Sequence, residues 1–460
     1  MIPCLTGFVF LLLSFCGQFW INKGRQITLV AAMAAVLAAL LLRGHSLWLL
    51  FPALALIHAA LVFVDRWTGH TVAALLNLAA GCLLLISDLP ALFQAEPFIL
   101  KLLTVLLLLL LALMLSFVTY VTFCPAQVMR TVRDKLMKNG NTADAEQREE
   151  MLEEGVRRIS DLRYDEKLPN GFLDVYLPVK EKARKLTVVY VHGGGYIWGD
   201  KASGDPNAGS NAFDASLPVQ LSCAGYPVVS MNYALSPEYR YPMAIRQLSR
   251  GLHWLSQQGA SYGLSMEHVV LAGASAGGNL AGVLANIETN PNYAEKMDIR
   301  PAFPVGTLKA MIFEGGLMDN RLFGVTHNAL YDYVFYHMGR VYLSTNELIG
   351  NDALAPSNVI DNVTERFPPS FISDGNYATF YDQARALDKR LRELGVTTQL
   401  NIFPIEQAGK LVHGFEESGS EWGKKTTLLI TAFLDALKLE GEERDGYKTG
   451  IQRSDSQKRI

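Results

Sequence analysis

The sequence predicts an α/β fold, a mostly parallel twisted sheet with helices on both faces, preceded by an all-α apolar region. Two observations lead to this prediction. From Phe172 onward, short apolar runs alternate with helical patterns, as in repeated βα units. In contrast, the first 124 residues of the 460-residue chain are dominated by apolar side chains and carry few charges. The chain is therefore expected to contain two parts with different environments.

Five apolar stretches in the first part approach the length that spans a bilayer, which is about 20 residues. They cover residues 2–21, 27–42, 47–64, 71–86 and 98–123. Residues 1–124 are therefore predicted to be a transmembrane helical region of about five spans, or four if one stretch lies in the interface. A cleaved signal peptide is the alternative for the first stretch. However, that stretch lacks a basic leading segment, and further apolar stretches follow it.

Basic residues flank the apolar region unevenly, and this predicts its orientation because cytoplasmic flanks are rich in Lys and Arg. Such residues follow the first and the fifth stretches: Lys23, Arg25, Arg130, Arg133, Lys135 and Lys138. With five spans they place the chain after Cys124 in the cytoplasm, although Arg43 and Lys101 favour the opposite. We expect an integral membrane protein of the cell membrane, in contact with membrane lipids. Scarce ionisable residues favour an anchor over a channel or pump, and substrate delivery or lipid sensing is the alternative role.

The polar part divides into three predicted segments. Residues 125–165 are expected to be a linker followed by an amphipathic helix, 166–440 the α/β domain, and 441–460 a disordered, charged tail. The net charge of −3 gives no electrostatic reason to expect nucleic-acid binding. The five cysteines suggest neither a disulfide framework nor a metal site. In an open sheet of this class, ligands bind beyond the carboxyl ends of the strands.

A Gly-x-Ser-x-Gly pattern, formed by Gly273, Ser275 and Gly277, lies in the stretch VVLAGASAGGN. An apolar strand precedes it and a helix of small residues follows it, which is the context of a nucleophile elbow. Such a turn is too tight for side chains beside the serine, whose hydroxyl stands exposed at the strand end. The pattern predicts that Ser275 is a nucleophile, with a glycine-rich packing turn as the alternative.

A second glycine cluster lies about 80 residues earlier, in VHGGGYIWGD, directly after another apolar strand. Consecutive glycines allow backbone amides to approach one atom closely. Together with the residue after a nucleophile, such amides can hold the negative charge that develops on a substrate oxygen. The predicted oxyanion hole consists of Gly194, Gly195 and Ala276. The neighbouring Tyr196 and Trp198 are expected either to line the substrate pocket or to pack the loop.

These motifs, with two others, resemble the hormone-sensitive-lipase-like branch of the α/β-hydrolase superfamily over residues 173–439. HGGGYIWGD resembles its HGGG motif, and GASAGGN is similar to its GDSAGGN elbow, with Ala274 where Asp is usual. NYALSPEYRYPMAI resembles its YRLAPE segment, and LVHGFEE resembles the HGF segment that carries a catalytic histidine. The resemblance implies an α/β-hydrolase fold and esterase or lipase activity. It does not extend to the apolar region.

The remaining catalytic groups follow from chain order, which in these hydrolases is Ser, acid, His. His413, in LVHGFEE, is the predicted base that takes the Ser275 proton. The resemblance places the usual acid at Ala378, which cannot orient an imidazole. The nearest carboxylate, Asp374, is therefore the predicted acid. The other candidates for the acid are Asp382, Glu314 and Asp319.

Together these residues predict a membrane-anchored serine hydrolase that cleaves small or lipid carboxylic esters through an acyl-enzyme. No metal and no organic cofactor is implied. A deacetylase or acyltransferase acting on a lipid or envelope precursor is one alternative. A catalytically inactive membrane binding or signalling module is another, because Ala378 stands at the usual acid position. Residues 322–351 are rich in Tyr, His and Phe and could form part of a substrate-selecting cap.

Overall fold

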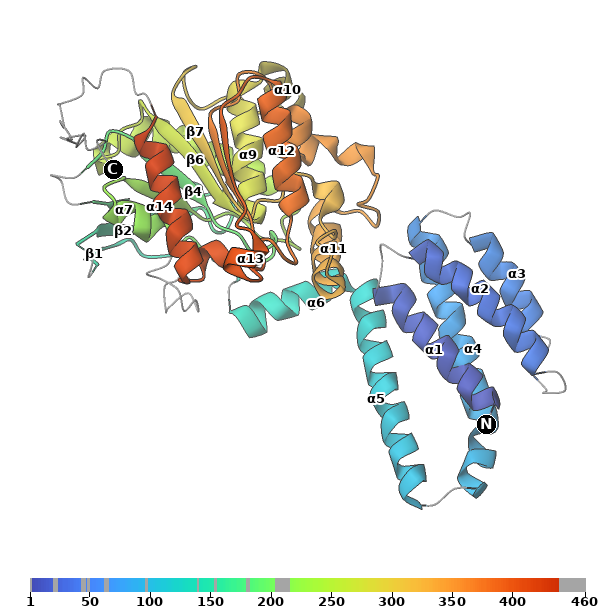
Figure 1. Cartoon of the computed structure of the whole chain (residues 1–460). Helices are drawn as coiled ribbons and strands as arrows, with labels where there is room; N and C mark the ends of the chain where they lie inside the picture. The colour runs from blue at the N-terminus through green and yellow to red at the C-terminus, as the bar shows by residue number, and fades with distance from the viewer. Residues whose placement is uncertain are drawn as a thin grey trace, which may run out of the picture.

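The structure is a computed structural model, and it places apolar helices at one end of the molecule and an α/β unit at the other (Figure 1). The residues that it describes are 2–19, 24–42, 47, 50–61, 66–95, 98–138, 140–152, 155–178, 183–202 and 216–437. The predicted tail, 441–460, lies outside these residues.

The described part of the α/β unit is built on a sheet of nine strands in the order β1-β2-β3-β5-β4-β6-β7-β8-β9. The strands at one edge are antiparallel: β1 (Arg148–Met151), β2 (Arg157–Arg163) and β3 (Phe172–Leu177). The other strands run parallel to one another: β4 (Thr187–Val191), β5 (Val228–Met231), β6 (Val269–Ala274), β7 (Leu308–Glu314), β8 (Ser370–Ser373) and β9 (Thr398–Asn401). The predicted α/β fold with a mostly parallel sheet is confirmed.

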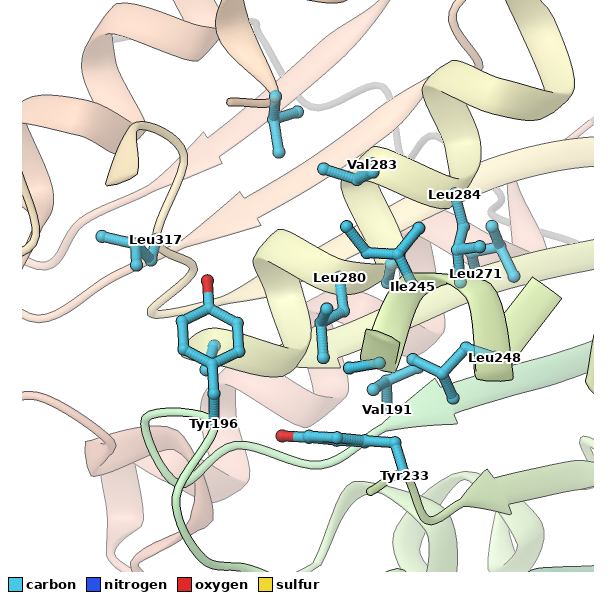
Figure 2. Packing of buried hydrophobic residues seen from close by; sticks show 14 of the residues in the cluster. Val191, Tyr196, Tyr233, Ile245, Leu248, Leu271, Leu280, Val283, Leu284 and Leu317 are labelled. Carbon is cyan, nitrogen blue, oxygen red and sulfur yellow. The ribbon is translucent and has the colours of Figure 1, made fainter. Parts of the chain in front are cut away.

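Helices cover both faces of the sheet, so the central strands are apolar without alternation. One face packs against α7 (Leu217–Cys223) and α14 (Glu421–Asp435). The other face packs against α8 (Met243–Gln258), α9 (Ala276–Thr289), α10 (Pro291–Met297) and α12 (Tyr381–Glu393). In Figure 2, Leu271 of β6 meets Leu284 of α9, and Ile245 of α8 lies beside them.

The segment predicted to be a linker and an amphipathic helix, 125–165, has a different structure. It starts with α6 (Pro125–Thr131) and a π-helical turn (Val132–Met137), and then supplies the edge strands β1 and β2. The sequence pattern did not predict these strands, because they carry charged residues whose side chains pair across the sheet. Arg158 is buried and donates to Asp174 Oδ2 at 2.8 Å, while Arg157 donates to Glu149 on β1 at 2.7 Å. The sheet therefore begins before residue 166.

The apolar region forms the helices α1 (Ile2–Phe19), α2 (Gly24–Leu41), α3 (Leu50–Leu61), α4 (Arg66–Ala95) and α5 (Phe98–Phe123). Among the described residues, no single helix is both long and apolar enough to cross a membrane. A pair bent by 103°, Ala112–Phe123 with Pro125–Met137, meets the requirement by length and composition. The predicted multi-span region is therefore not supported by the helices.

A helix of the α/β unit packs against the apolar region. This helix, α11 (Ala329–Leu343), lies in the expected cap segment after β7. Tyr333 donates its hydroxyl to the carbonyl of Val118 at 3.2 Å, and its ring lies 5.1 Å from that of Phe19. Arg340 donates to the carbonyl of Thr122 at 2.9 Å. The helix α11 thus touches both α1 and α5. The remaining short helix, α13 (Ile405–Ala408), follows β9.

Candidate active site

Ser275 lies in a sharp turn between β6 and α9, with φ 52° and ψ −119°. L-residues rarely adopt this backbone conformation, and where they do so it is often at functional sites. The flanking glycines are sterically required. A Cβ on Gly273 would lie 2.4 Å from the carbonyl oxygen of Gly277, and a Cβ on Gly277 would lie 2.1 Å from that of Val191. The turn places the Ser275 hydroxyl at the carboxyl edge of the sheet.

The predicted base meets the predicted nucleophile. His413 lies in the loop after α13, and its Nε2 is 2.8 Å from Ser275 Oγ. The rings of Phe335 and Phe380 face the imidazole edge-on, with centroids 5.3 and 5.1 Å away. Burial lowers the pKa of His413 to about 4. The ring is therefore neutral near pH 7 and can accept a proton from the serine.

Asp374 reaches the histidine through a third side chain, Thr379. The hydroxyl of Thr379 lies 3.0 Å from His413 Nδ1 and 2.5 Å from Asp374 Oδ1. An ionised carboxylate only accepts hydrogen bonds, so the hydroxyl donates to Asp374 and accepts from Nδ1–H. This arrangement leaves Nε2 unprotonated toward Ser275, which is the tautomer that a general base needs. The link from Asp374 to the imidazole is therefore indirect.

The other candidates for the acid are engaged elsewhere or lack this link. Asp382 pairs with His327 at 2.7 Å on the surface, and Asp319 pairs with Arg321 at 2.6 Å. Glu314 lies at the carboxyl end of β7, where its backbone carbonyl accepts from the Ser275 amide at 2.8 Å. Among the four carboxylates weighed from the sequence, Asp374 is the one joined to the His413 ring through a hydrogen-bonded side chain.

Sequence reasoning missed Thr379. The hydroxyl follows directly after Ala378, the usual acid position, and a threonine there gave no independent signal. Ala378 is buried, with φ 52°, and it carries no group that could reach the imidazole. The carboxylate four residues earlier, Asp374, instead reaches the imidazole through the hydroxyl of Thr379.

Three carboxylates at or near this link are buried, Asp374, Glu416 and Glu314, with the half-buried Glu417 beside them, and burial favours their neutral forms. Burial raises the pKa of Asp374 to about 7, although hydrogen bonds from Thr379 and Gly375 act in the opposite direction. Burial, reinforced by the charge of Asp374, raises the pKa of Glu416 to about 8. The pKa of Glu314 is raised well above its usual range, first by burial and then by Glu417 and Glu416. Among the described residues, these groups do not form a metal site.

The glycine loop lies beside Ser275 and presents free amides. Gly194 has φ +105°, and a Cβ there would lie 2.1 Å from the carbonyl oxygen of Trp198. A Cβ on Gly195 would lie 2.5 Å from Met338 Sδ. Within the described chain, the amides of Gly194, Gly195 and Ala276 donate to no protein acceptor. Polar hydrogens without a protein partner, beside a serine at a helix N-terminus, can bind an anionic oxygen.

The segment NYALSPE holds this loop in place. The ring of Tyr233 stacks on His192 with centroids 4.4 Å apart, and its hydroxyl donates to the His192 carbonyl at 3.1 Å. Asn232 Nδ2 donates to Asp200 Oδ2 at 2.7 Å at the other end of the loop. The loop conformation is thus fixed from both ends by one neighbouring segment.

A hollow of about 330 Å³ opens in front of Ser275. Its lining comprises His192, Gly193, Gly194, Gly195, Trp198, Gly199, Asp200, Ala274, Ser275, Glu314, Phe335, Met338, His413, Gly414, Glu416 and Glu417. Of the two aromatic candidates, Trp198 borders the hollow. Tyr196 instead lies in the core (Figure 2), stacked on Tyr342 with centroids 3.7 Å apart, and its hydroxyl donates to Asn320 at 3.1 Å.

Comparison with known proteins agrees with this geometry. Residues 188–416 match a family model described as having the α/β hydrolase fold, and this part of the chain has that fold. Esterase LipI of Mycobacterium tuberculosis is 26% identical over 264 residues, covering 56% of this chain and 75% of that protein. An acetyl esterase of Salmonella dublin is 27% identical over 244 residues, covering 51% and 68%. The chain is therefore a hydrolase of the carboxylesterase type.

A solved structure is similar to the fold as well. Esterase B of Lactobacillus rhamnosis has a TM-score of 0.53 at 24% identity, covering 68% of this chain and 94% of that one. At this identity the likeness concerns the fold alone.

Proposed function

We propose that this protein is a membrane-anchored serine esterase in which Ser275 is the nucleophile and His413 the general base. The main observation in support of this proposal is the 2.8 Å contact between Ser275 Oγ and His413 Nε2, next to the amides of Gly194 and Gly195. Asp374 acts as the acid through Thr379. This link answers the objection that Ala378 leaves the site without an acid, and it favours an active enzyme over an inactive binding module.

In the proposed reaction, His413 Nε2 removes the proton from Ser275 Oγ as the oxygen attacks the ester carbonyl. The amides of Gly194, Gly195 and Ala276 hold the oxyanion, and removing one such donor typically costs about 10²–10³-fold in turnover. His413 then gives its proton to the departing alcohol, leaving an acyl group on Ser275. Water, deprotonated by His413, attacks the acyl carbonyl, and His413 then returns the proton to Ser275 Oγ as the bond to the acyl group breaks and the carboxylic acid leaves.

The membrane part of the proposal rests on exposed apolar surface. Most of the exposed large apolar side chains described belong to α1–α5, for example Leu56 (73%), Leu113 (69%) and Ile86 (68%). Soluble proteins rarely expose contiguous apolar surface on this scale. We propose that these helices lie in lipid of the cell membrane, with the hydrolase unit on the cytoplasmic side, as the basic residues after Cys124 predict. Extraction of the protein by alkaline carbonate without detergent would contradict membrane insertion, and an extracytoplasmic signal from a reporter fused after Cys124 would contradict the orientation.

The catalytic part is tested by labelling the full chain with a fluorophosphonate, which reacts with activated serines. The wild-type protein is expected to be labelled and to hydrolyse p-nitrophenyl butyrate. Ser275→Ala is expected to do neither, while it elutes from gel filtration like wild type. Equal labelling of both proteins would contradict the assignment of Ser275, and turnover that survives in Ser275→Ala would contradict the mechanism.

A further inference from the structure

We propose that the acyl chain of the ester lies in an apolar cavity between the N-terminal helices and α11. This inference rests on the proposed esterase function and specifies its substrates: esters whose acyl chain is long enough to pass from Ser275 into that cavity. The N-terminal region would then contribute directly to substrate binding, besides its role in the membrane.

The cavity has a volume of about 490 Å³ and lies within the size range of small-molecule sites, about 300–1,000 Å³. Phe15 and Phe19 of α1, Met114 and Phe117 of α5 and Val334 of α11 belong to its lining. A lining of this composition provides few hydrogen-bonding groups for a polar ligand.

Apart from Trp198, the polar side chains in the lining are Tyr333 and His337. Each makes one hydrogen bond, while His337 Nε2 is buried without a hydrogen-bond partner among the described residues. The Tyr333 hydroxyl donates to the carbonyl of Val118 at 3.2 Å. His337 Nδ1 lies 3.0 Å from Arg340 Nη1, and burial lowers the pKa of His337 well below its usual range. A neutral imidazole and an occupied hydroxyl do not attract a charged group, so the cavity suits a hydrocarbon chain.

The position of the cavity next to the active site favours the acyl chain of an ester as the hydrocarbon. Trp198, from the loop that carries the oxyanion amides, lines both this cavity and the hollow at Ser275. The helix α11 lies between the two spaces. Its residues Phe335 and Met338 line the hollow, whereas Val334 and His337 line the cavity. This alternation follows from helical geometry, in which adjacent residues point to different faces.

A larger apolar cavity, of about 640 Å³, lies between α1, α4 and α5. Among the described residues it shares no lining residue with the hollow at Ser275, unlike the cavity beside α11. Proximity to Trp198 therefore distinguishes the cavity beside α11 as the acyl site.

The direct test uses the detergent-solubilised full chain and an alkyl fluorophosphonate whose long chain ends in a diazirine. After reaction at Ser275, irradiation is expected to crosslink the chain end to the peptides of α1 or α5 that contain Phe15, Phe19, Met114 or Phe117. Crosslinks confined to the α/β unit, or quenching by detergent alone, would overturn the acyl site while leaving the esterase function intact. Failure of Ser275 to react at all would instead contradict the proposed function.

A matched pair of variants on α5 gives an independent readout. Met114→Trp enlarges a side chain that lines the cavity and is 43% exposed, whereas Leu113→Trp changes a neighbouring side chain that is 69% exposed and outside the lining. Each buried methylene is worth about fourfold in binding, so excluding a few of them should lower kcat/KM for p-nitrophenyl decanoate about tenfold or more in Met114→Trp. The ratio of kcat/KM for decanoate to kcat/KM for p-nitrophenyl acetate should therefore fall about tenfold or more, because the acetyl group does not reach the cavity.

The control Leu113→Trp should change the hydrolysis of neither ester. Unchanged decanoate hydrolysis in Met114→Trp, or an equal loss on both esters, would overturn the inference. The same holds for a wild-type enzyme that hydrolyses acetate readily and decanoate not at all.

Discussion

Replacing Thr379 with valine removes the hydroxyl between Asp374 and His413 at almost constant volume. The hydroxyl makes two hydrogen bonds, of 2.5 Å to Asp374 and 3.0 Å to His413. A hydrogen bond to a charged group is worth about 1.5–3 kcal/mol, and about 1.4 kcal/mol corresponds to tenfold in rate. Losing the link should therefore lower kcat by about 10²-fold. The upper bound is about 10⁴-fold, the effect of disabling a triad acid.

The assay compares kcat and KM for p-nitrophenyl butyrate in wild type, Thr379→Val and Thr379→Ser. Serine restores the hydroxyl without the methyl group, so Thr379→Ser should keep most of the activity. KM should change little in both variants, because Thr379 acts on the imidazole and not on the ester. A wild-type kcat in Thr379→Val would refute the reasoning. A loss in Thr379→Ser as large as in Thr379→Val would show that packing, and not the hydroxyl, is what matters.

Two further predictions concern the buried carboxylates. If Thr379 must donate to an ionised Asp374, kcat should fall as the pH is lowered through about 7, where Asp374 becomes protonated, well above the pKa of about 4 of His413. A pH profile that stays flat down to about pH 5 would contradict this role for Asp374. Glu416 has a folded-state pKa of about 8, above its usual value, so its ionisation is unfavourable in the folded protein. It adds no pH-dependent cost at low pH and destabilises the protein increasingly as the pH rises toward 8. Glu416→Gln can still accept the hydrogen bond from Ser373. At about pH 9 this substitution should raise the melting temperature by an amount equivalent to about 1–3 kcal/mol of unfolding free energy. At about pH 4 it should leave the melting temperature almost unchanged. A rise of the same size at both pH values would contradict the predicted linkage.

The parts of the site that follow from local backbone demands were predictable from the sequence. Glycine is required at Gly273, Gly277 and Gly194 because any side chain there would collide with backbone, and the surrounding apolar strands place these turns at one edge of the sheet. Ser275 could be proposed for the same reason, whereas the proposal of His413 rests on the chain order Ser, acid, His and on the resemblance of LVHGFEE to the HGF segment. Their contact at 2.8 Å depends on the topology that these turns define.

The parts that depend on distant residues could not be predicted. The role of Thr379 depends on how far the loop after β8 carries its hydroxyl from Asp374, and no local pattern encodes that distance. The strand β2 was missed because Arg158 pairs with Asp174 inside the sheet, so a charged residue stands where an apolar one was expected. The cavity beside α11 is formed by helices that are separated by some two hundred residues of sequence.

The central claim, that Ser275 carries the acyl group, is tested most directly by rapid mixing with a p-nitrophenyl ester followed by acid quenching and peptide mass spectrometry. We expect a burst of p-nitrophenol no larger than the enzyme concentration, together with a peptide containing Ser275 that is heavier by one acyl group. Turnover with no acylated peptide, or with the acyl group on another residue, would contradict it.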